Sequence, residues 1–174
     1  FAVIPMSGLA TDIYLPSMPS MATELHQPES NIQLTLSIFL ISYGLTQFFA
    51  GSIVDSFGRY RISMLSLGLF VASFLITATT QNIFVIYAMR VLQGVLSGFA
   101  VVSKIAFFVV VYEGEERKHY LSIMTIVWSV GPIIAPFIGG YLQKSFGWQS
   151  NFYVLAGYSL VLLILEFIFS GETL

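Results

Sequence analysis

Apolar residues run along this chain in six long stretches, separated by short polar segments. The stretches cover residues 1–18, 32–54, 62–80, 83–111, 120–142 and 151–170. A bilayer core about 30 Å thick takes about 20 apolar residues of α-helix to cross. Lipid offers the backbone no hydrogen-bond partner, and the runs lack the alternation of barrel strands. Each stretch is therefore predicted to be a membrane-spanning helix, the first of them cut short at its start.

Composition supports an integral membrane protein of the all-α class. The chain is 56% hydrophobic and only 9% charged, whereas a soluble domain carries roughly 25% charged residues. It has no cysteine, so it has neither a disulfide framework nor a thiolate metal site. Its net charge of -2 comes without a basic stripe, which argues against nucleic acid as a partner. Residues 1–18 lack a charged leader region, so they are interpreted as a truncated spanning helix rather than a signal peptide.

The basic residues favour one membrane orientation. Arg59 and Arg61 lie between the second and third runs, and Arg117 and Lys118 lie between the fourth and fifth. The opposite side carries only Lys144, between the fifth and sixth runs. Cytoplasmic loops hold an excess of Lys and Arg. Both ends of this segment are therefore predicted to be cytoplasmic.

A charged turn joins the second and third runs. Its candidate gate residues are Gly51, Asp55, Gly58, Arg59 and Arg61. Residues 51–59 are echoed by residues 140–148, which share the Ser-Phe-Gly core and end the fifth run. The two segments fall on opposite membrane faces, as a 3+3 inverted repeat would place them. The alternative is a chance match in a chain rich in Gly, Ser and Phe.

Four ionisable residues lie inside the apolar runs, where charge is costly and usually functional. Asp12 and Arg90 are both about 10–15 Å below the outer surface, so we expect them to face one another or a shared cavity. Asp12 is a candidate proton carrier, or alternatively a helix cap before Pro16. Arg90 is a candidate for coupling protonation to substrate binding. The alternative is a structural role, in an ion pair or in a bond to freed backbone carbonyls. Lys104, near the inner end on almost the same helix face as Arg90, is a functional candidate or alternatively snorkels to the interface. Glu166, near the inner end of the sixth run, is expected to snorkel.

Small residues form a second signal. Gly94 and Gly98 are one turn apart on the fourth run and would allow close helix contact. The fifth run carries a denser set, which comprises Gly131, Pro132, Pro136, Gly139 and Gly140. Prolines free backbone carbonyls and kink helices, so this set predicts a bending or tightly packed gate. The alternative is ordinary packing with tolerated prolines.

Together these motifs resemble the major facilitator superfamily, and within it the drug:proton antiporters of the Bcr/CflA type. Residues 11–19 resemble the helix 1 signature of that type, and residues 51–61 resemble the signature between helices 2 and 3. Residues 90–94 are similar to the helix 4 motif, whose arginine the family associates with proton coupling. Residues 131–140 resemble the antiporter motif of helix 5, and residues 172–174 resemble the end of helix 6.

The chain departs from the family pattern at two places. Pro136 and a longer glycine spacing alter the helix 5 motif. On helix 4, Lys104 matches a basic residue of the pattern, but the apolar run 107–111 replaces the following Arg-Asp pair. An acid in that pair would brace the turn between helices 2 and 3. Glu113 and Glu115 are alternatives at a different spacing.

The resemblance implies a carrier of twelve helices, of which residues 1–174 form the N-terminal six-helix bundle and the C-terminal half is absent from this chain. It implies export of small apolar or cationic compounds across the bacterial inner membrane in exchange for protons, with no metal and no cofactor beyond the proton gradient. The candidate cavity residues are Tyr14, Tyr43, Gln47, Gln93 and Trp128.

Two other functions remain open. A symporter or facilitator for a sugar, nucleoside or organic acid would share the bundle. A non-transporting scaffold or sensor would keep the packing glycines but tolerate the loss of charge at Asp12 and Arg90. An enzyme is not expected, because the sequence shows no metal-ligand cluster, phosphate loop or nucleophile–base pair.

Overall fold

Helices account for nearly all of the chain in the computed structural model, which describes residue 3 and residues 5–169. They are α1 (Met6–Asp12), the 3₁₀ turn η1 (Leu15–Ser17), α2 (Met18–Glu24), α3 (Glu29–Phe57), α4 (Arg59–Thr79), α5 (Ile83–Val111), α6 (Gly114–Phe146) and α7 (Gln149–Phe169). Within the described residues, the five helices α3 to α7 are long and apolar enough to cross a membrane. The prediction of an all-helical membrane fold is thus confirmed.

The first apolar run differs from its prediction, because it is not one continuous helix. Its last α1 bond joins the Ile13 amide to the Leu9 carbonyl, and the chain then tightens into η1, where the Ser17 amide donates to the Tyr14 carbonyl. Pro16 has no amide hydrogen, so the regular ladder cannot continue through it. The part of the predicted span at residues 1, 2 and 4 lies outside the described residues.

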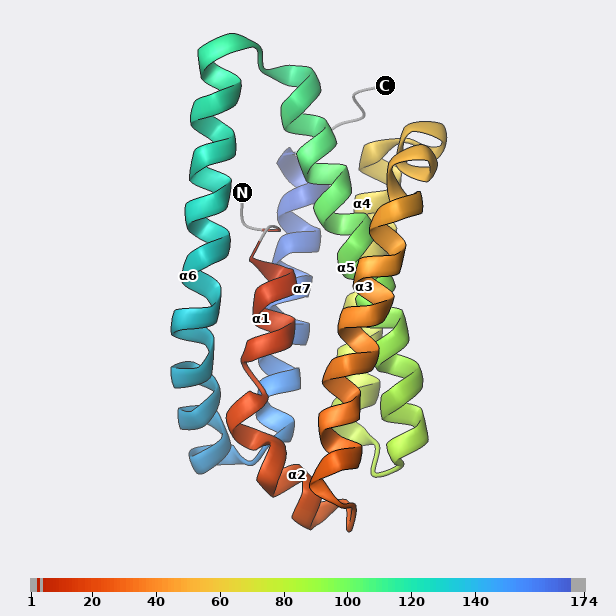
Figure 1. Cartoon of the computed structure of the whole chain (residues 1–174), viewed down its shortest axis with the longest axis vertical. Coiled ribbons are helices and arrows are strands. Elements are labelled where there is room, and N and C mark those ends of the chain that lie inside the picture. The colour runs from red at the N-terminus through yellow and green to blue at the C-terminus, as the bar shows by residue number, and fades with distance from the viewer. Residues whose placement is uncertain (1–2, 4, 170–174) are drawn as a thin grey trace.

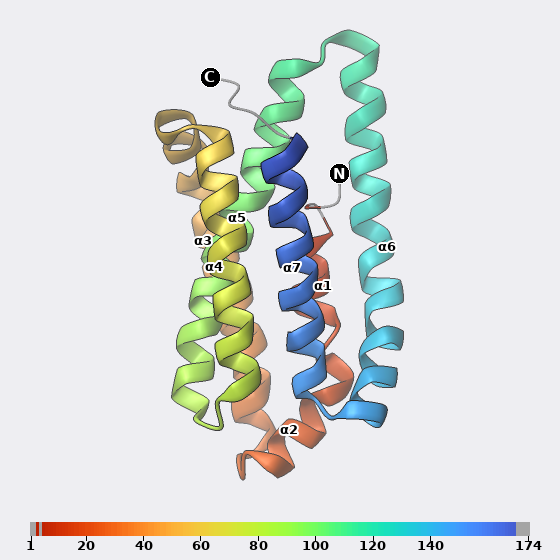
Figure 2. The ribbon, with the colours of Figure 1, turned by 180° about the vertical axis from the view of Figure 1, so that it is seen from behind.

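The long helices pack into a bundle in which α5 lies against both α3 and α4 (Figures 1 and 2). Two glycines on α5 explain how closely α3 approaches. A Cβ on Gly94 would come within 2.5 Å of the Phe39 carbonyl oxygen, and one on Gly98 within 2.8 Å of Thr46. The predicted close contact at these glycines is confirmed. On the other side of the bundle, α4 packs on α7 and α1 packs on α6.

The turns at the upper end of Figure 1 are shorter than predicted, and the charged residues lie in helices. Helix α6 begins at Gly114, so Arg117 and Lys118 belong to its first turns rather than to a loop. Helices α3 and α4 together contain all of residues 51–61 except Gly58. The predicted runs 32–54 and 120–142 therefore end too early, because polar residues beyond the apolar core still continue the helical hydrogen bonding.

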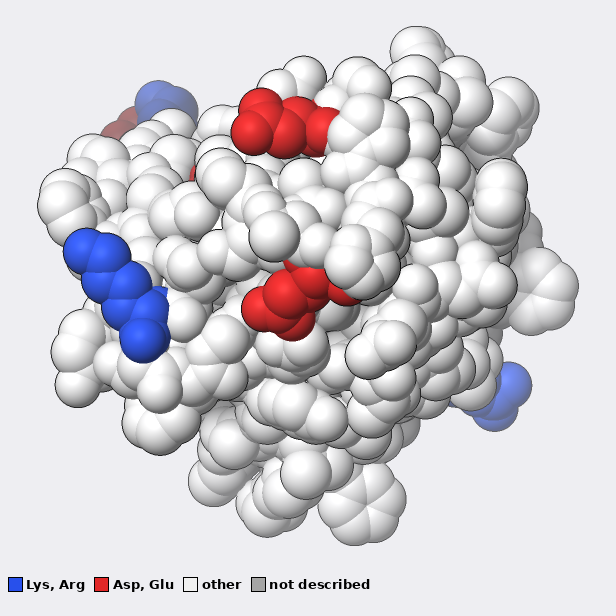
Figure 3. Space-filling view, turned by 90° about the horizontal axis from the view of Figure 1, so that it is seen from below, with Lys and Arg blue, Asp and Glu red and all other residues white. Residues whose placement is uncertain are grey.

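The two ends of the bundle differ in how many charged residues they carry. The upper end in Figure 1 carries the turn between α3 and α4 and the start of α6, whose four basic residues lie beside the acids Asp55, Glu113, Glu115 and Glu116. Figure 3 views the lower end, where acidic side chains form two separate patches and most of the surface is uncharged. Lys144, in the last turn of α6, is the basic residue at the lower end of that helix.

Two glycines make equivalent turns at opposite ends of the bundle. Gly58 ends α3 with a φ of 93°, and Gly147 ends α6 with a φ of 86°. Side chains with a Cβ rarely adopt this conformation, so glycine is required at both turns. The predicted tight turn at Gly58 is confirmed. At Gly51, another candidate gate residue, a Cβ would meet no atom within 4 Å.

Candidate functional site

A cavity of about 310 Å³ opens between α3, α5 and α6. It is lined by Tyr43, Gln47, Val101, Ile105, Leu121, Met124, Thr125 and Trp128. Three of the five predicted cavity residues, Tyr43, Gln47 and Trp128, are among them. The walls are mainly apolar with a few polar groups, which is the usual character of a small-molecule site, although this cavity is near the lower limit of size.

Ser7 of α1 lies beside this cavity. Its hydroxyl accepts a hydrogen bond of 3.3 Å from the indole N–H of Trp128. The Tyr43 hydroxyl, from α3, lies close enough to interact with both Ser7 and Gln47. Ser7 itself is almost fully buried. Sequence reasoning did not single out Ser7, because a lone serine in an apolar helix carries no motif.

Arg90 is fully buried beside α1. Its Nη1 donates a hydrogen bond of 3.1 Å to the carbonyl of Ala10. Its guanidinium lies over the ring of Tyr14 at 3.9 Å, and the rings of Phe152 and Phe39 are 5.1 and 5.8 Å away. A buried cation is stabilised over aromatic faces. Among the described residues, its Nε and Nη2 have no hydrogen-bond partner.

Asp12 and Arg90 do not form an ion pair. Within the described part of the chain, the ion pairs do not include Asp12, and its partly buried carboxylate makes no hydrogen bond. The interpretation of Asp12 as a helix cap thus has no contact to support it. Arg90 instead bonds to the backbone two residues before Asp12, so the two charges are connected through α1.

Two predicted cavity residues lie elsewhere. Tyr14 is fully buried, where it covers Arg90 and shares a hydrogen bond of 3.1 Å with Thr35. Gln93 is also fully buried and donates to the Thr77 hydroxyl at 3.1 Å. Both residues therefore belong to the packed interior around α5 and not to the cavity wall.

Lys104 and Glu166 form an ion pair between α5 and α7. Their side chains are 14% and 7% exposed. The expectation that Glu166 snorkels to the interface is wrong, and so is the snorkelling alternative for Lys104, because each charge pairs with the other inside the bundle. The residues are far apart in sequence, and no pattern within either helix indicates that they meet.

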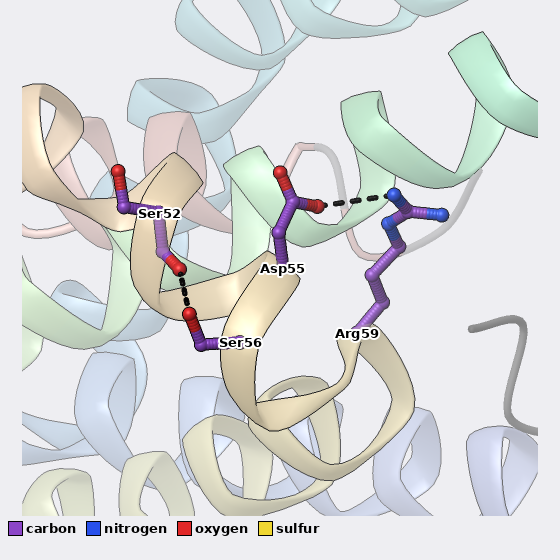
Figure 4. A network of polar contacts seen from close by, with 4 residues as sticks. All are labelled: Ser52, Asp55, Ser56 and Arg59. Atoms are coloured by element: carbon purple, nitrogen blue, oxygen red, sulfur yellow. Dashed lines mark hydrogen bonds and ion pairs between the residues drawn. The ribbon is translucent and has the colours of Figure 1, made fainter.

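The charged turn between α3 and α4 is held by local contacts (Figure 4). Arg59 forms an ion pair of 3.0 Å with Asp55, one helical turn earlier. The Ser56 hydroxyl donates to the Ser52 carbonyl at 2.7 Å. Glu115, considered above as a brace for this turn, pairs instead with Lys118 on its own helix at 2.7 Å.

The glycine and proline residues of α6 pack against the broken first segment. A Cβ on Gly139 would overlap the carbonyl of Ile13, the C-cap residue of α1. A Cβ on Gly140 would lie 3.8 Å from the ring of Pro16, and Pro132 lies beside Gly8. The prediction of tight packing is confirmed at Gly139, whereas a Cβ on Gly131 would meet no atom within 4 Å. Pro136 lies in the same uninterrupted helix.

A set of side-chain hydrogen bonds, here called the lower clamp, ties η1 and α2 to the junction of α6 and α7. It comprises Asn151 to Ser17 (2.7 Å), Gln143 to Ser20 (2.6 Å), and Trp148 and Gln149 to Glu24 (2.8 and 3.2 Å). Sequence reasoning missed this clamp, because its members come from segments more than 100 residues apart. It fixes the lower part of the first segment independently of α1.

Comparison with known proteins adds three findings. The family described as Major Facilitator Superfamily matches residues 1–172. The multidrug resistance protein MdtL of Vibrio parahaemolyticus is 33% identical in an alignment of 176 positions, which covers 100% of this chain and 44% of that protein. The bicyclomycin resistance protein homolog of Haemophilus influenzae is 30% identical and is matched over 99% of this chain and 43% of its own length.

A solved structure supports the fold. The human organic anion transporter MFSD10 superposes with a TM-score of 0.75 at 21% identity, over 100% of this chain and 46% of that one. At 21% identity, this structural similarity is evidence for the fold alone. The chain spans less than half the length of each of these three proteins.

Proposed function

Because this chain belongs to the Major Facilitator Superfamily, we propose that it forms the N-terminal six-helix bundle of a twelve-helix, proton-coupled exporter of small apolar or cationic compounds. It is a multi-pass membrane protein of a transporter family rather than an enzyme. The relatives named for multidrug and bicyclomycin resistance support drug-like substrates. Residues 1–174 would be one half of the carrier, and the other half would complete the site.

One observation carries this proposal: a mainly apolar cavity lies beside the short helix that bears Asp12 and contacts Arg90. An apolar wall with aromatic rings suits a lipophilic or cationic compound. Asp12 is the proposed proton carrier and Arg90 the proposed coupling cation, since ionisable groups inside a membrane are functional candidates. Two bundles would rock around this site to alternate its access.

The finer topology is also a proposal. We infer that the broken segment of α1, η1 and α2 completes the sixth span, and that the upper end of Figure 1, with its four Lys and Arg residues, lies on the cytoplasmic side of a bacterial inner membrane. The matching turns at Gly58 and Gly147, at opposite ends, support a 3+3 inverted repeat. We infer that the charged turn, in which Asp55 pairs with Arg59, acts as a gate against the other bundle.

Asp12→Asn should abolish proton release driven by substrate. Amide nitrogen and oxygen take up no proton at physiological pH, so the variant would bind substrate without exchanging it for a proton. The measurement uses the complete carrier in inverted vesicles, with a pH-sensitive dye and added tetraphenylphosphonium. Glu29→Gln, an exposed acid in the first turn of α3, is the matched control and should behave as the wild type. Undiminished proton release from Asp12→Asn would refute the proton-carrier role, and uptake driven by the proton gradient would indicate a symporter.

Trp128→Ala should weaken binding of tetraphenylphosphonium about tenfold, because an aromatic wall residue is lost from the cavity. Equilibrium dialysis of the purified complete carrier measures the dissociation constant. Phe137→Ala is the matched control, since Phe137 lies on the same helix, is 78% exposed and does not line the cavity. Equal affinity in the Trp128 variant and the wild type would exclude this cavity as the binding site.

A further inference from the structure

Ser7 is the polar contact between α1 and the cavity wall. Trp128 of α6 donates its indole hydrogen to the Ser7 hydroxyl at 3.3 Å, and Tyr43 of α3 lies close to the same hydroxyl. Trp128 and Tyr43 both line the cavity. A compound that enters the cavity must therefore pack against side chains that hold Ser7 in place.

The same short helix reaches Arg90 three residues later. The Ala10 carbonyl would accept from the Tyr14 amide in a continuing helix, but α1 ends at Asp12 and Arg90 occupies that carbonyl instead. The carbonyl end of a helix carries partial negative charge, which favours a cation there. The position of α1 thus decides whether Arg90 keeps its one observed hydrogen bond among the described residues.

Helix α1 is also separated from the rest of the first segment. Its seven residues end where the ladder breaks before Pro16, and the lower clamp holds the chain from Ser17 to Glu24. A short helix next to a break moves with less cost than the middle of a continuous one, because no internal hydrogen bonds must be broken. A displacement of α1 would therefore leave η1 and α2 where they are.

We propose that Ser7 is a positioning residue, which transmits occupancy of the cavity through α1 to the contact between Ala10 and Arg90 next to Asp12. This proposal rests on the proposed function, since it assumes that the cavity binds substrate and that Asp12 carries the proton. A ligand that displaces Trp128 breaks its bond to Ser7 and releases α1. In the reverse direction, a change of charge on Asp12 alters the position of α1 and hence of Trp128, because coupling between two sites is reciprocal.

The experiment measures this coupling in the complete carrier. The coupling is the ratio of two tetraphenylphosphonium dissociation constants, one for the Asp12→Asn variant and one for the carrier in which Asp12 is intact. Coupled sites in proteins typically change one another's affinity by about 5-fold or more. We expect such a ratio with Ser7 present and a ratio below about twofold in Ser7→Ala. Trp128→Phe removes the same hydrogen bond from the other side but keeps a ring in the cavity, so it should reduce the ratio equally. The double variant Ser7→Ala with Trp128→Phe should show the same ratio of dissociation constants as each single variant.

Two control variants separate coupling from general damage. Ser7→Thr keeps the hydroxyl and should retain the ratio. Thr11→Val removes another hydroxyl from α1, whose hydrogen bond of 2.6 Å goes only to the Ser7 backbone carbonyl, and it should also retain the ratio. Wild-type coupling in both Ser7→Ala and Trp128→Phe would refute the role of Ser7. Absence of probe binding in the wild type would refute the cavity itself, and binding that does not respond to Asp12→Asn would refute the coupling.

Discussion

Replacing Glu166 by glutamine should lower the free energy of unfolding of the complete carrier by about 3–5 kcal/mol, because the change leaves Lys104 as an unpaired charge inside the bundle. Both side chains are largely covered by protein. The loss should appear as unfolding at lower denaturant in SDS titrations in mixed micelles. Lys104→Met should cause a similar loss, because it leaves the glutamate unpaired.

The double variant Lys104→Met with Glu166→Leu separates the cost of an unpaired charge from the value of the pair. Replacement of both partners by apolar side chains is often neutral or stabilising, so most of the stability should return. Glu115→Gln is a matched control on an exposed pair and should cost less than about 1 kcal/mol. If the double variant is as unstable as the single variants, the ion pair stabilises the bundle in itself and does not only neutralise two buried charges.

Gly139→Ala should have the second large effect, because its methyl group would overlap the Ile13 carbonyl. Both groups in this collision are fixed to the backbone, so α6 and the break after α1 must move apart. Overpacking of this kind costs about 1–3 kcal/mol. We also expect transport to fall more than stability does, because the separation shifts the segment that carries Asp12. Unfolding titrations and substrate-driven proton release, measured on the same preparation, check the two effects.

The neighbouring glycines provide matched controls. Gly131→Ala adds a methyl group that meets no atom within 4 Å, and Gly140→Ala adds one in ordinary contact with Pro16 at 3.8 Å. Both should leave transport near the wild-type value, and stability should stay the same or rise slightly, because alanine has the higher helical propensity. An equal loss in all three variants would show that flexibility of α6, and not contact with Ile13, is what its glycines provide.

The sequence was a good guide to helices whose ends carry a chemical signal. The run predicted over 83–111 coincides with α5, because Asn82 caps the helix by accepting a hydrogen bond from the Phe84 amide. The first run was harder, because its apolar composition indicates a span while Pro16 and Pro19 decide where the hydrogen bonding breaks. Apolar composition indicates that a segment lies in the membrane. The backbone N–H groups available for hydrogen bonding decide whether it forms one continuous helix.

The candidate site was predictable in part. Tyr43, Gln47 and Trp128 do line one cavity, whereas Tyr14 covers Arg90. Helical periodicity gives the face on which a side chain lies, but it does not tell which helix packs on that face. The pair of Lys104 and Glu166 was missed for the same reason, since its 62-residue separation is bridged only by tertiary packing.

The short turns, of one residue at Gly58 and of two residues at Gly147 and Trp148, have a mechanical consequence. A turn of one or two residues has almost no slack, so a tilt of α3 must be carried into α4, and a tilt of α6 into α7. The hairpin of α3 and α4 is joined to the hairpin of α6 and α7, because α4 also packs on α7. We therefore expect the two hairpins to move together. A tilt at one end of the bundle is thereby transmitted to the opposite end, and α1, which belongs to neither hairpin, follows it through its packing on α6.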